Sequence, residues 1–107
     1  MVRAPLRVPV ELRHGERWFR VAVAVSTDGL ALGSAAPAEL DGPPVEVAFH
    51  LPGDARAIRC VGRAAEERVG EGDEERAELR AIQFLDLQEA DRARIASYVE
   101  ERSGTFS

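Results

Sequence analysis

Short runs that alternate between apolar and polar residues are the feature that most constrains the fold of this chain. Alternation with a period of two places successive side chains on opposite faces of a β-strand, so each run predicts a strand with one buried face. Segments rich in glycine and proline separate the runs, as turns do between antiparallel strands. The predicted strands cover residues 7–13, 17–25, 30–33, 45–51, 56–65 and 77–85.

The period changes at Asp86, after which apolar residues recur at roughly helical spacing. Asp86, followed three residues later by Glu89, resembles a helix capping box with Asp86 as the cap. The pattern predicts a helix from about Leu87 to Glu101. The apolar stripe of this helix is expected to consist of Leu87, Ala90, Ile95, Tyr98 and Val99.

Six short strands followed by one helix predict a mainly β fold. The arrangement that fits best is a small antiparallel barrel or sandwich of six strands, with its open end covered by the C-terminal helix. A chain of 107 residues is long enough for one modest core. We therefore expect a single domain over residues 1–102 and a flexible tail over residues 103–107.

The second predicted strand ends abruptly, in the sequence VAVAVSTDGLAL. Simple alternation predicts that Val21, Val23 and Val25 face one side of the sheet and that Ala22 and Ala24 face the other. Alanine on one face allows close packing. The residues STDG then break the strand as a turn, and the chain becomes apolar again.

Composition excludes several classes of function. A net charge of −5 argues against general binding of nucleic acids. No apolar run is long enough to cross a membrane and no signal peptide is visible, so we expect no membrane association. The single cysteine, Cys60, fits a reducing compartment, most simply the cytoplasm, and is expected to pack as a small buried hydrophobe. His14, His50 and Cys60 lack metal-ligand spacing, so no metal or other cofactor is predicted.

Charge is distributed unevenly along the chain. Residues 1–20 carry five arginines against two glutamates, and residues 66–78 carry seven acidic residues against two arginines. We expect the acidic segment to be a solvated hairpin loop. Alternatively, it speeds docking on a basic partner surface, because complementary charge raises association rates. In that case, reversing Asp73, Glu74 and Glu75 to arginine would slow association.

Two arginines and a serine–glycine turn are predicted to meet at one end of the barrel. Arg3 and Arg7 precede the first strand, and Ser26 and Gly29 follow the second. A hairpin through the turn at Gly15 would place the start of the first strand beside the end of the second. Guanidinium groups bind phosphates and guanine, while the serine hydroxyl and free N–H groups of the turn would add hydrogen bonds. Gly29 permits positive φ and close approach of a ligand. These residues outline an anion or nucleotide site.

The sequence resembles the PilZ domain, a bacterial module that is typically a receptor for cyclic di-GMP. The family pattern is R-x-x-x-R before the first strand and D/N-x-S-x-x-G after the second, and this chain has RAPLR and AVSTDG. VEVAFHLPG looks like the family's middle strand, and AIQFLDLQEADRARIASYV looks like its last strand and closing helix. The resemblance extends from Arg3 to about Tyr98. It implies a barrel of the split-barrel type and a cyclic di-GMP site at Arg3, Arg7, Ser26 and Gly29.

Ala24 departs from that pattern, because it stands where the family has Asp or Asn. In the family this side chain supports recognition of guanine, and a methyl group accepts no hydrogen bond. Losing a charge-assisted pair costs about 1.5–3 kcal/mol, which is roughly ten- to a hundredfold in affinity. Asp28 lies inside the turn and is not expected to substitute. Arg13 and Arg17 repeat the arginine spacing, but across a turn rather than before a strand.

Three hypotheses for function follow. In the first, the chain is a PilZ-type signalling module that acts through a protein partner, unknown from the sequence, and binds cyclic di-GMP weakly or not at all. In the second, it is a working cyclic di-GMP receptor that uses Arg3, Arg7, Ser26 and a compensating residue. The third is a small enzyme. The spacing of Ser26, His50 and the carboxylates supports no catalytic triad, so we expect no enzymatic activity.

Overall fold

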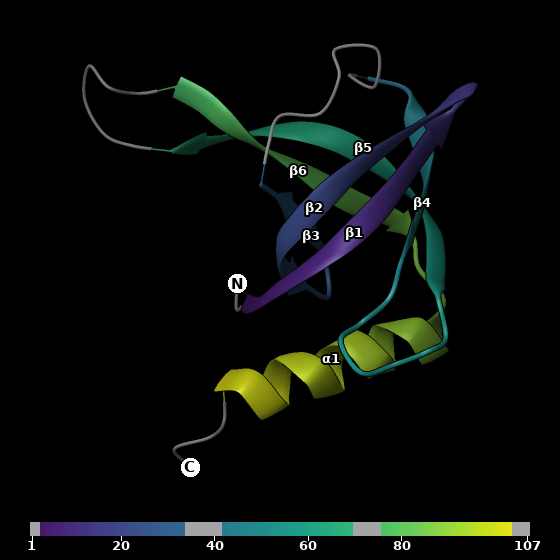
Figure 1. Ribbon diagram of the computed structural model, residues 1–107, viewed down its shortest axis with the longest axis vertical. Helices are drawn as coiled ribbons and strands as arrows, with labels where there is room; N and C mark the ends of the chain where they lie inside the picture. The colour runs from purple at the N-terminus through teal and green to yellow at the C-terminus, as the bar shows by residue number, and fades with distance from the viewer. Residues whose placement is uncertain (1–2, 34–41, 70–75, 104–107) are drawn as a thin grey trace.

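Six antiparallel strands form a closed barrel, and one helix covers an end of it (Figure 1). The computed structural model describes residues 3–33, 42–69 and 76–103. The elements are β1 (Ala4–His14), β2 (Glu16–Ser26), β3 (Gly29–Leu32), β4 (Pro44–Phe49), β5 (Ile58–Val69), β6 (Arg76–Asp86) and α1 (Glu89–Ser103). The strand order around the barrel is β1-β2-β3-β6-β5-β4, and β4 pairs with β1 to close it. The predicted fold class is confirmed.

Strand β1 begins at Ala4, three residues before the predicted start at Arg7, so Arg7 lies inside the strand rather than at its first position. The pairing of β1 with β2 shifts between Pro5 and Val8. A bulge of this kind inserts residues into one strand and bends it. The bulge interrupts the period-two alternation within RAPLR. For this reason the sequence pattern does not show that RAPLR belongs to the strand.

The alternation expected for β2 is wrong in its upstream half. Val21 is 40% exposed, whereas Ala22 and Val25 are both fully buried. The pairing of β2 with β3 shifts between Ala22 and Ala24. A bulge changes which residues of a strand face the core. Here the buried residues Ala22 and Val25 are three positions apart, whereas regular alternation would place buried residues two apart. Val21 therefore lies outside the barrel although Val25 lies inside.

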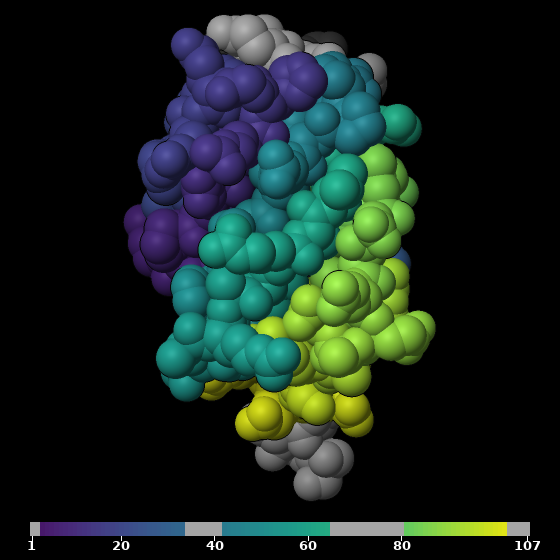
Figure 2. Space-filling view, turned by 90° about the vertical axis from the view of Figure 1, so that its right-hand side faces the viewer, coloured from purple at the N-terminus to yellow at the C-terminus, as the bar shows by residue number. Residues whose placement is uncertain are grey.

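The core fills the barrel and continues into the helix. Ile95, Tyr98 and Val99 of α1 are buried against the barrel residues. The rings of Phe49 and Phe84 stack within this core, with centroids 6.1 Å apart. Figure 2 shows one side of the wall, where β4 and β5 (teal) lie between β1–β2 (purple to blue) and β6 (green), with α1 at one end.

The start of the helix differs from its prediction. Asp86 is the last residue of β6, and α1 begins at Glu89, so Asp86 does not cap the helix. The N–H of Arg92 donates to the carbonyl of Gln88 at 2.9 Å, which places the first helical hydrogen bond at Gln88. Ala90, predicted to belong to the buried stripe, is exposed. The helix also extends through Ser103, one residue into the predicted tail.

Both ends of the acidic segment are strand. Strand β5 continues to Val69 and β6 begins at Arg76, so both ends of the predicted loop 66–78 belong to the β5–β6 hairpin. The correction arises because the glutamates and arginines of this segment leave no apolar alternation to read. Asp73, Glu74 and Glu75 lie outside the described residues, as do residues 104–107 of the predicted tail.

Candidate functional site

The β1–β2 hairpin brings the two predicted motif segments together. Ala4 pairs with Val25 and Pro5 pairs with Ala24, so the start of β1 lies beside the end of β2. Ala4 and Val25 are buried, whereas Arg3, Pro5 and Arg7 are exposed on the outer face. Because facing residues in an antiparallel pair share a face, Ala24 also lies on the outer face, opposite Pro5. The register therefore brings the two arginines to the outer face beside the end of β2, whereas the Ser26 side chain is buried.

The Ser26 side chain stabilises the turn that follows β2. Its side chain is buried, with 2% of its surface exposed. The N–H of Asp28 donates to Ser26 Oγ at 3.1 Å, so one of the turn N–H groups expected to be free is already used. The carbonyl of Asp28 accepts from the N–H of Phe84 at 2.8 Å. Ser26 thus shapes the turn and links it, through Asp28, to β6.

Gly29 is required for a close approach of backbone rather than for unusual torsion angles. Among the described glycines, positive φ occurs at Gly15, Gly42 and Gly53, and Gly29 is not one of them. A Cβ built on Gly29 would collide with the carbonyl oxygen of Ile82. A side chain at this position would force β3 away from β6. The expected role in positive φ is therefore wrong, although a glycine is needed.

Helix α1 contacts both motif segments. Arg92 Nη1 donates to the carbonyl of Thr27 at 2.8 Å, within the turn after β2. The hydroxyl of Tyr98 donates to the carbonyl of Pro5 at 2.9 Å, within the start of β1. Both bonds join residues far apart in the sequence. The helix that closes the barrel therefore also fixes the position of the candidate site.

Sequence reasoning missed Arg92 and Tyr98 as parts of the site. Arg92 carries no motif, because it is one of three arginines that follow residue 90 at irregular spacing. Tyr98 was identified only as an apolar position of the stripe. A buried tyrosine usually has a hydrogen-bond partner for its hydroxyl. From this rule, a hydrogen bond from Tyr98 to another segment of the chain is expected.

Small side chains surround Ala24 on its face of the sheet. Ala24 pairs with Pro5 on β1 and with Ala31 on β3, and Ala31 pairs in turn with Ala81 on β6. None of these neighbours carries a hydrogen-bond acceptor on its side chain. In the adjacent row, Gly29 pairs with the exposed Gln83. Gln83 is thus the polar side chain that this register places nearest to the Ser26–Gly29 turn from β6.

A second polar cluster fixes the other part of α1. Arg94 donates to Asp54 Oδ2 through Nη2 at 2.6 Å and through Nε at 3.2 Å. It also reaches Asp91 Oδ1 at 2.8 Å and the carbonyl of Arg56 at 2.6 Å. Hydrogen bonds from the Arg94 side chain, and then from the Arg56 N–H, hold the pKa of Asp54 below its ordinary value of 3.8. This cluster ties α1 to the segment between β4 and β5.

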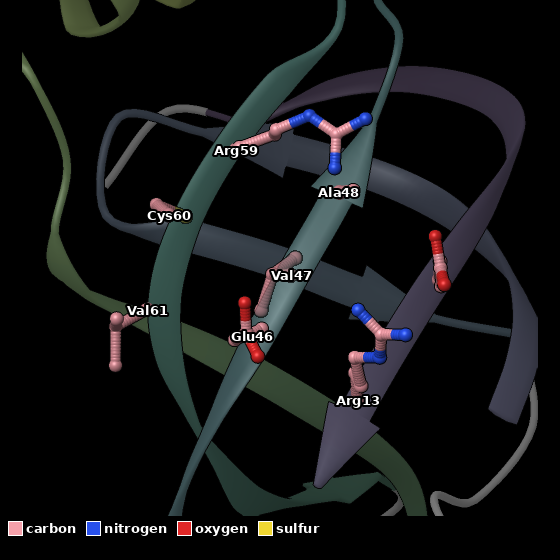
Figure 3. A pocket seen from close by; sticks show the side chains of 8 residues that line it. Arg13, Glu46, Val47, Ala48, Arg59, Cys60 and Val61 are labelled. Atoms are coloured by element: carbon pink, nitrogen blue, oxygen red, sulfur yellow. The ribbon is translucent and has the colours of Figure 1, made fainter. Parts of the chain in front are cut away.

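An open groove of about 250 Å³ lies on the outer face of β1, β4 and β5, away from the motif cluster (Figure 3). Register explains its shape, because Ala48 sits between Glu11 and Arg59, and Glu46 sits beside Arg13. The small Ala48 side chain leaves a depression between longer charged ones. Acidic and basic groups line the described groove in equal number, so it does not select for an anion.

Cys60, on the wall of that groove, is half-buried and packs against the core. Burial, with smaller contributions from Asp91 and Asp86, raises the pKa of the Cys60 thiol to about 12. The thiol is therefore protonated at neutral pH and is a poor nucleophile.

Neither a metal-binding cluster nor a membrane-spanning helix occurs in the described part of the chain. No group of three or more His, Cys, Asp or Glu side chains in these residues could hold a metal ion. Of the helical residues that the structure covers, none forms a segment long and apolar enough to cross a membrane.

Comparison with known proteins shows a common fold. A family model described as the PilZ domain matches residues 2–101. The inhibitor of motility MotI/DgrA of Bacillus subtilis superposes with a TM-score of 0.75 at 14% identity, and the match covers 99% of this chain and 51% of that one. The PilZ domain of CeSA from a cellulose-synthesizing bacterium superposes with a TM-score of 0.59 at 22% identity, covering 94% and 97%. The chain therefore spans about half of the first protein. No curated protein matches it.

Proposed function

The chain belongs to the PilZ domain family, and we propose that it is a non-enzymatic signalling module that acts through a protein partner and binds cyclic di-GMP weakly or not at all. Members of the family generally bind cyclic di-GMP. The single cysteine leads us to place the protein in the reducing cytoplasm.

The observation that carries the proposal is the surroundings of Ala24. The family's Asp or Asn is absent at this position, and the direct cross-strand neighbours Pro5 and Ala31 offer no acceptor in its place. The other residues of the D/N-x-S-x-x-G motif, Ser26 and Gly29, have roles in the fold. Ser26 closes the turn through Asp28, and Gly29 allows β3 to approach β6. A site can therefore retain its serine and glycine without retaining its affinity.

For the alternative, a working receptor with a compensating residue, the described residues offer Gln83 as a candidate. Gln83 is exposed and lies opposite Gly29 on the outer face. Its amide oxygen can accept a hydrogen bond, but without a negative charge. Neutral hydrogen bonds contribute roughly half as much as charge-assisted ones, so we expect Gln83 to compensate at most partly.

Restoring the missing carboxylate tests the proposal. Ala24→Asp should raise the affinity for cyclic di-GMP about ten- to a hundredfold, because it returns a charged acceptor to the outer face. Ala48→Asp is the matched control, because Ala48 is another half-buried alanine on the outer face and lies on β4, away from the motif cluster. It adds the same charge and should not raise the affinity. Both affinities are measured by isothermal calorimetry.

A variant of Gln83 separates the two hypotheses. If Gln83→Ala lowers the affinity of the unmodified chain at least about tenfold, the glutamine is compensating and the receptor hypothesis is favoured. If Gln83→Ala has no effect and Ala24→Asp raises the affinity, the loss of the acceptor at Ala24 accounts for weak binding. An Ala24→Asp variant that folds and gains nothing would contradict the proposal.

A further inference from the structure

The groove on the outer face of β1, β4 and β5 carries charges of both signs that do not pair with one another (Figure 3). The charged side chains that line it are Glu11, Arg13, Glu46 and Arg59. Opposite charges that face each other on neighbouring strands commonly pair and stabilise a sheet. Arg13 and Glu46 face each other in the register of β1 with β4, yet among the described residues neither of them, nor Arg59, takes part in an ion pair. These three charges are therefore available to a ligand.

Ala48 forms the floor of the groove between a carboxylate and a guanidinium group. It pairs with Glu11 on β1 and with Arg59 on β5, so the three residues form one row across the sheet. Adjacent strands lie about 4.8 Å apart, which separates the backbones of β1 and β5 by roughly 9–10 Å in this row. Figure 3 shows the Arg59 side chain extending from β5 toward Ala48. The short Ala48 side chain leaves space for a molecule between the two charged ones.

Glu11 and Arg59 both retain hydrogen-bonding capacity toward this space. Arg17 Nε lies 3.5 Å from Glu11 Oε2, which is longer than a good hydrogen bond and engages one of the two carboxylate oxygens. Arg59 is exposed, and its guanidinium has no hydrogen bond or ion pair among the described residues. An ammonium group can therefore bind at Glu11, and a carboxylate can bind at Arg59.

The mixture of charges in the groove disfavours ligands of one sign. An anion bound at Arg59 is also near the carboxylates that line the groove, and a cation bound at Glu11 is also near the guanidinium groups. Repulsion between like charges offsets the attraction in either case. A molecule with both charges avoids this repulsion, because each end meets the opposite sign. The groove volume of about 250 Å³ is smaller than that of most ligand sites, so the molecule has on the order of ten non-hydrogen atoms.

From these observations we propose that the groove binds a small zwitterion of the length of a dipeptide, with its carboxylate at Arg59 and its ammonium group at Glu11. Two residues of extended chain span about 7 Å, which suits a gap of roughly 9–10 Å between backbones into which both side chains reach. Arg13 and Glu46 form the next row, where no small side chain leaves space between them. The inference goes beyond the proposed function, because it adds a second class of ligand on a face away from the motif cluster.

Alanyl-alanine is the probe, and its binding to the full chain is followed by the amide signals of the protein in proton–nitrogen correlation NMR near neutral pH. Three blocked compounds test the need for both charges. N-acetyl-alanyl-alanine keeps only the carboxylate, alanyl-alanine amide keeps only the ammonium group, and the doubly blocked compound keeps neither. Alanyl-alanine should shift the amide signals of Ala48 and Cys60. Each singly blocked compound should bind at least about tenfold more weakly, because it loses a charge-assisted hydrogen bond.

Variants of the protein assign each end of the ligand. Arg59→Gln should abolish the preference for alanyl-alanine over its amide, because the carboxylate then lacks a charged partner. Glu11→Gln should abolish the preference for alanyl-alanine over the N-acetyl compound, because the ammonium group then lacks one. Arg63→Gln is the matched control, because Arg63 is an exposed arginine on the same strand and does not line the groove. It should leave both preferences unchanged. Combining changes in ligand and protein isolates each contact.

Ala48→Leu tests the location of the ligand. The larger side chain fills the space between Glu11 and Arg59, so this variant should lose binding of alanyl-alanine. Circular dichroism verifies that each variant is folded. Retained binding by folded Ala48→Leu would place the ligand elsewhere on the surface and contradict the groove as its site.

Three further results would overturn the inference. They are an absence of shifts at Ala48 and Cys60 on addition of alanyl-alanine, equal affinity for alanyl-alanine and a singly blocked compound, and preferences that persist in both Arg59→Gln and Glu11→Gln. The proposed function is tested separately, because the affinity for cyclic di-GMP bears on none of these outcomes.

Discussion

Gly29 and Ser26 are motif residues whose structural roles can be tested without a ligand. Gly29 approaches the Ile82 carbonyl so closely that no side chain fits, and Ser26 accepts the N–H of Asp28 inside a buried turn. Both roles would be required in a barrel of this shape even if no nucleotide ever bound. Retention of the two residues is therefore weak support for an active cyclic di-GMP site.

Gly29→Ala should destabilise the fold. The added Cβ meets backbone rather than a flexible side chain, and overpacking of this kind costs about 1–3 kcal/mol. For a domain of this size, the melting temperature should fall by about 5–20 °C. Gly33→Ala is the matched control, because its added Cβ would meet a side-chain atom, Val23 Cγ1, at 3.1 Å. If both variants melt at the same temperature as the unmodified chain, the packing role assigned to Gly29 is wrong.

Asp54 gives the stability a defined dependence on pH. Its pKa is lowered in the folded state, chiefly by the hydrogen bond from Arg94, so its carboxylate favours folding above the unfolded value of 3.8. That contribution is lost as the pH falls through the folded pKa. Asp54→Asn should therefore lower the free energy of unfolding at pH 7 and have little effect near pH 2.

Urea unfolding of the unmodified chain and of Asp54→Asn at each pH measures the difference. Arg94→Ala removes the main partner of the carboxylate, so in that background Asp54→Asn should have much less effect at pH 7. The double variant thus isolates the pair from other consequences of either substitution. A difference that persists unchanged in acid would exclude the carboxylate as its cause.

At the scale of elements, α1 both closes the barrel and holds the motif segments. Arg92 and Tyr98 reach the carbonyls of Thr27 and Pro5, one on each segment. Tyr98→Phe keeps the ring in the core and removes only the hydroxyl. It should cost about 1–2 kcal/mol, because the Pro5 carbonyl loses its donor.

Thermal unfolding and amide exchange check this prediction. Tyr98→Phe and Arg92→Ala should each speed exchange in the segment that they contact, the start of β1 and the turn after β2 respectively. Glu100→Ala, at an exposed helical position, is the control. Unchanged exchange in both segments would mean that the helix packs on the barrel without fixing the candidate site.

Periodicity predicted the elements well and their ends poorly. The alternating runs identified all six strands, and the change of period at Asp86 identified the helix. The bulges near Pro5 and Val23 could not be predicted, because a bulge depends on the partner strand as well as on local sequence. The extension of β5 to Val69 was missed because the charged sequence after Ala65 shows no apolar alternation.

The candidate site was predictable in part. The hairpin argument predicted that the start of β1 lies beside the end of β2, because antiparallel pairing follows from a tight turn, and Ala4 does pair with Val25. The contributions of Arg92 and Tyr98 depend on how α1 docks, which involves residues more than sixty positions away. Tertiary contacts of this range leave no trace in local spacing.

At the scale of the whole molecule, the domain presents three different surfaces. The motif segments lie near α1 on the outer face of β1–β3, the mixed-charge groove lies over β1, β4 and β5, and the exposed apolar side chains of Phe19 and Val21 lie along β2. Under the proposed function, the second and third of these surfaces are the candidates for contact with a protein partner. This arrangement is consistent with a PilZ domain that transmits a signal by binding a partner.

Calorimetric titration of the unmodified chain with cyclic di-GMP tests the central claim most directly. Loss of the acceptor at Ala24 predicts weak or absent binding, because it costs about ten- to a hundredfold in affinity. The titration needs folded protein, which far-UV circular dichroism verifies as mainly strand with one helix. A Kd in the nanomolar range would contradict the account, because the arginines, Ser26 and the neighbouring side chains would then suffice for recognition without the missing carboxylate.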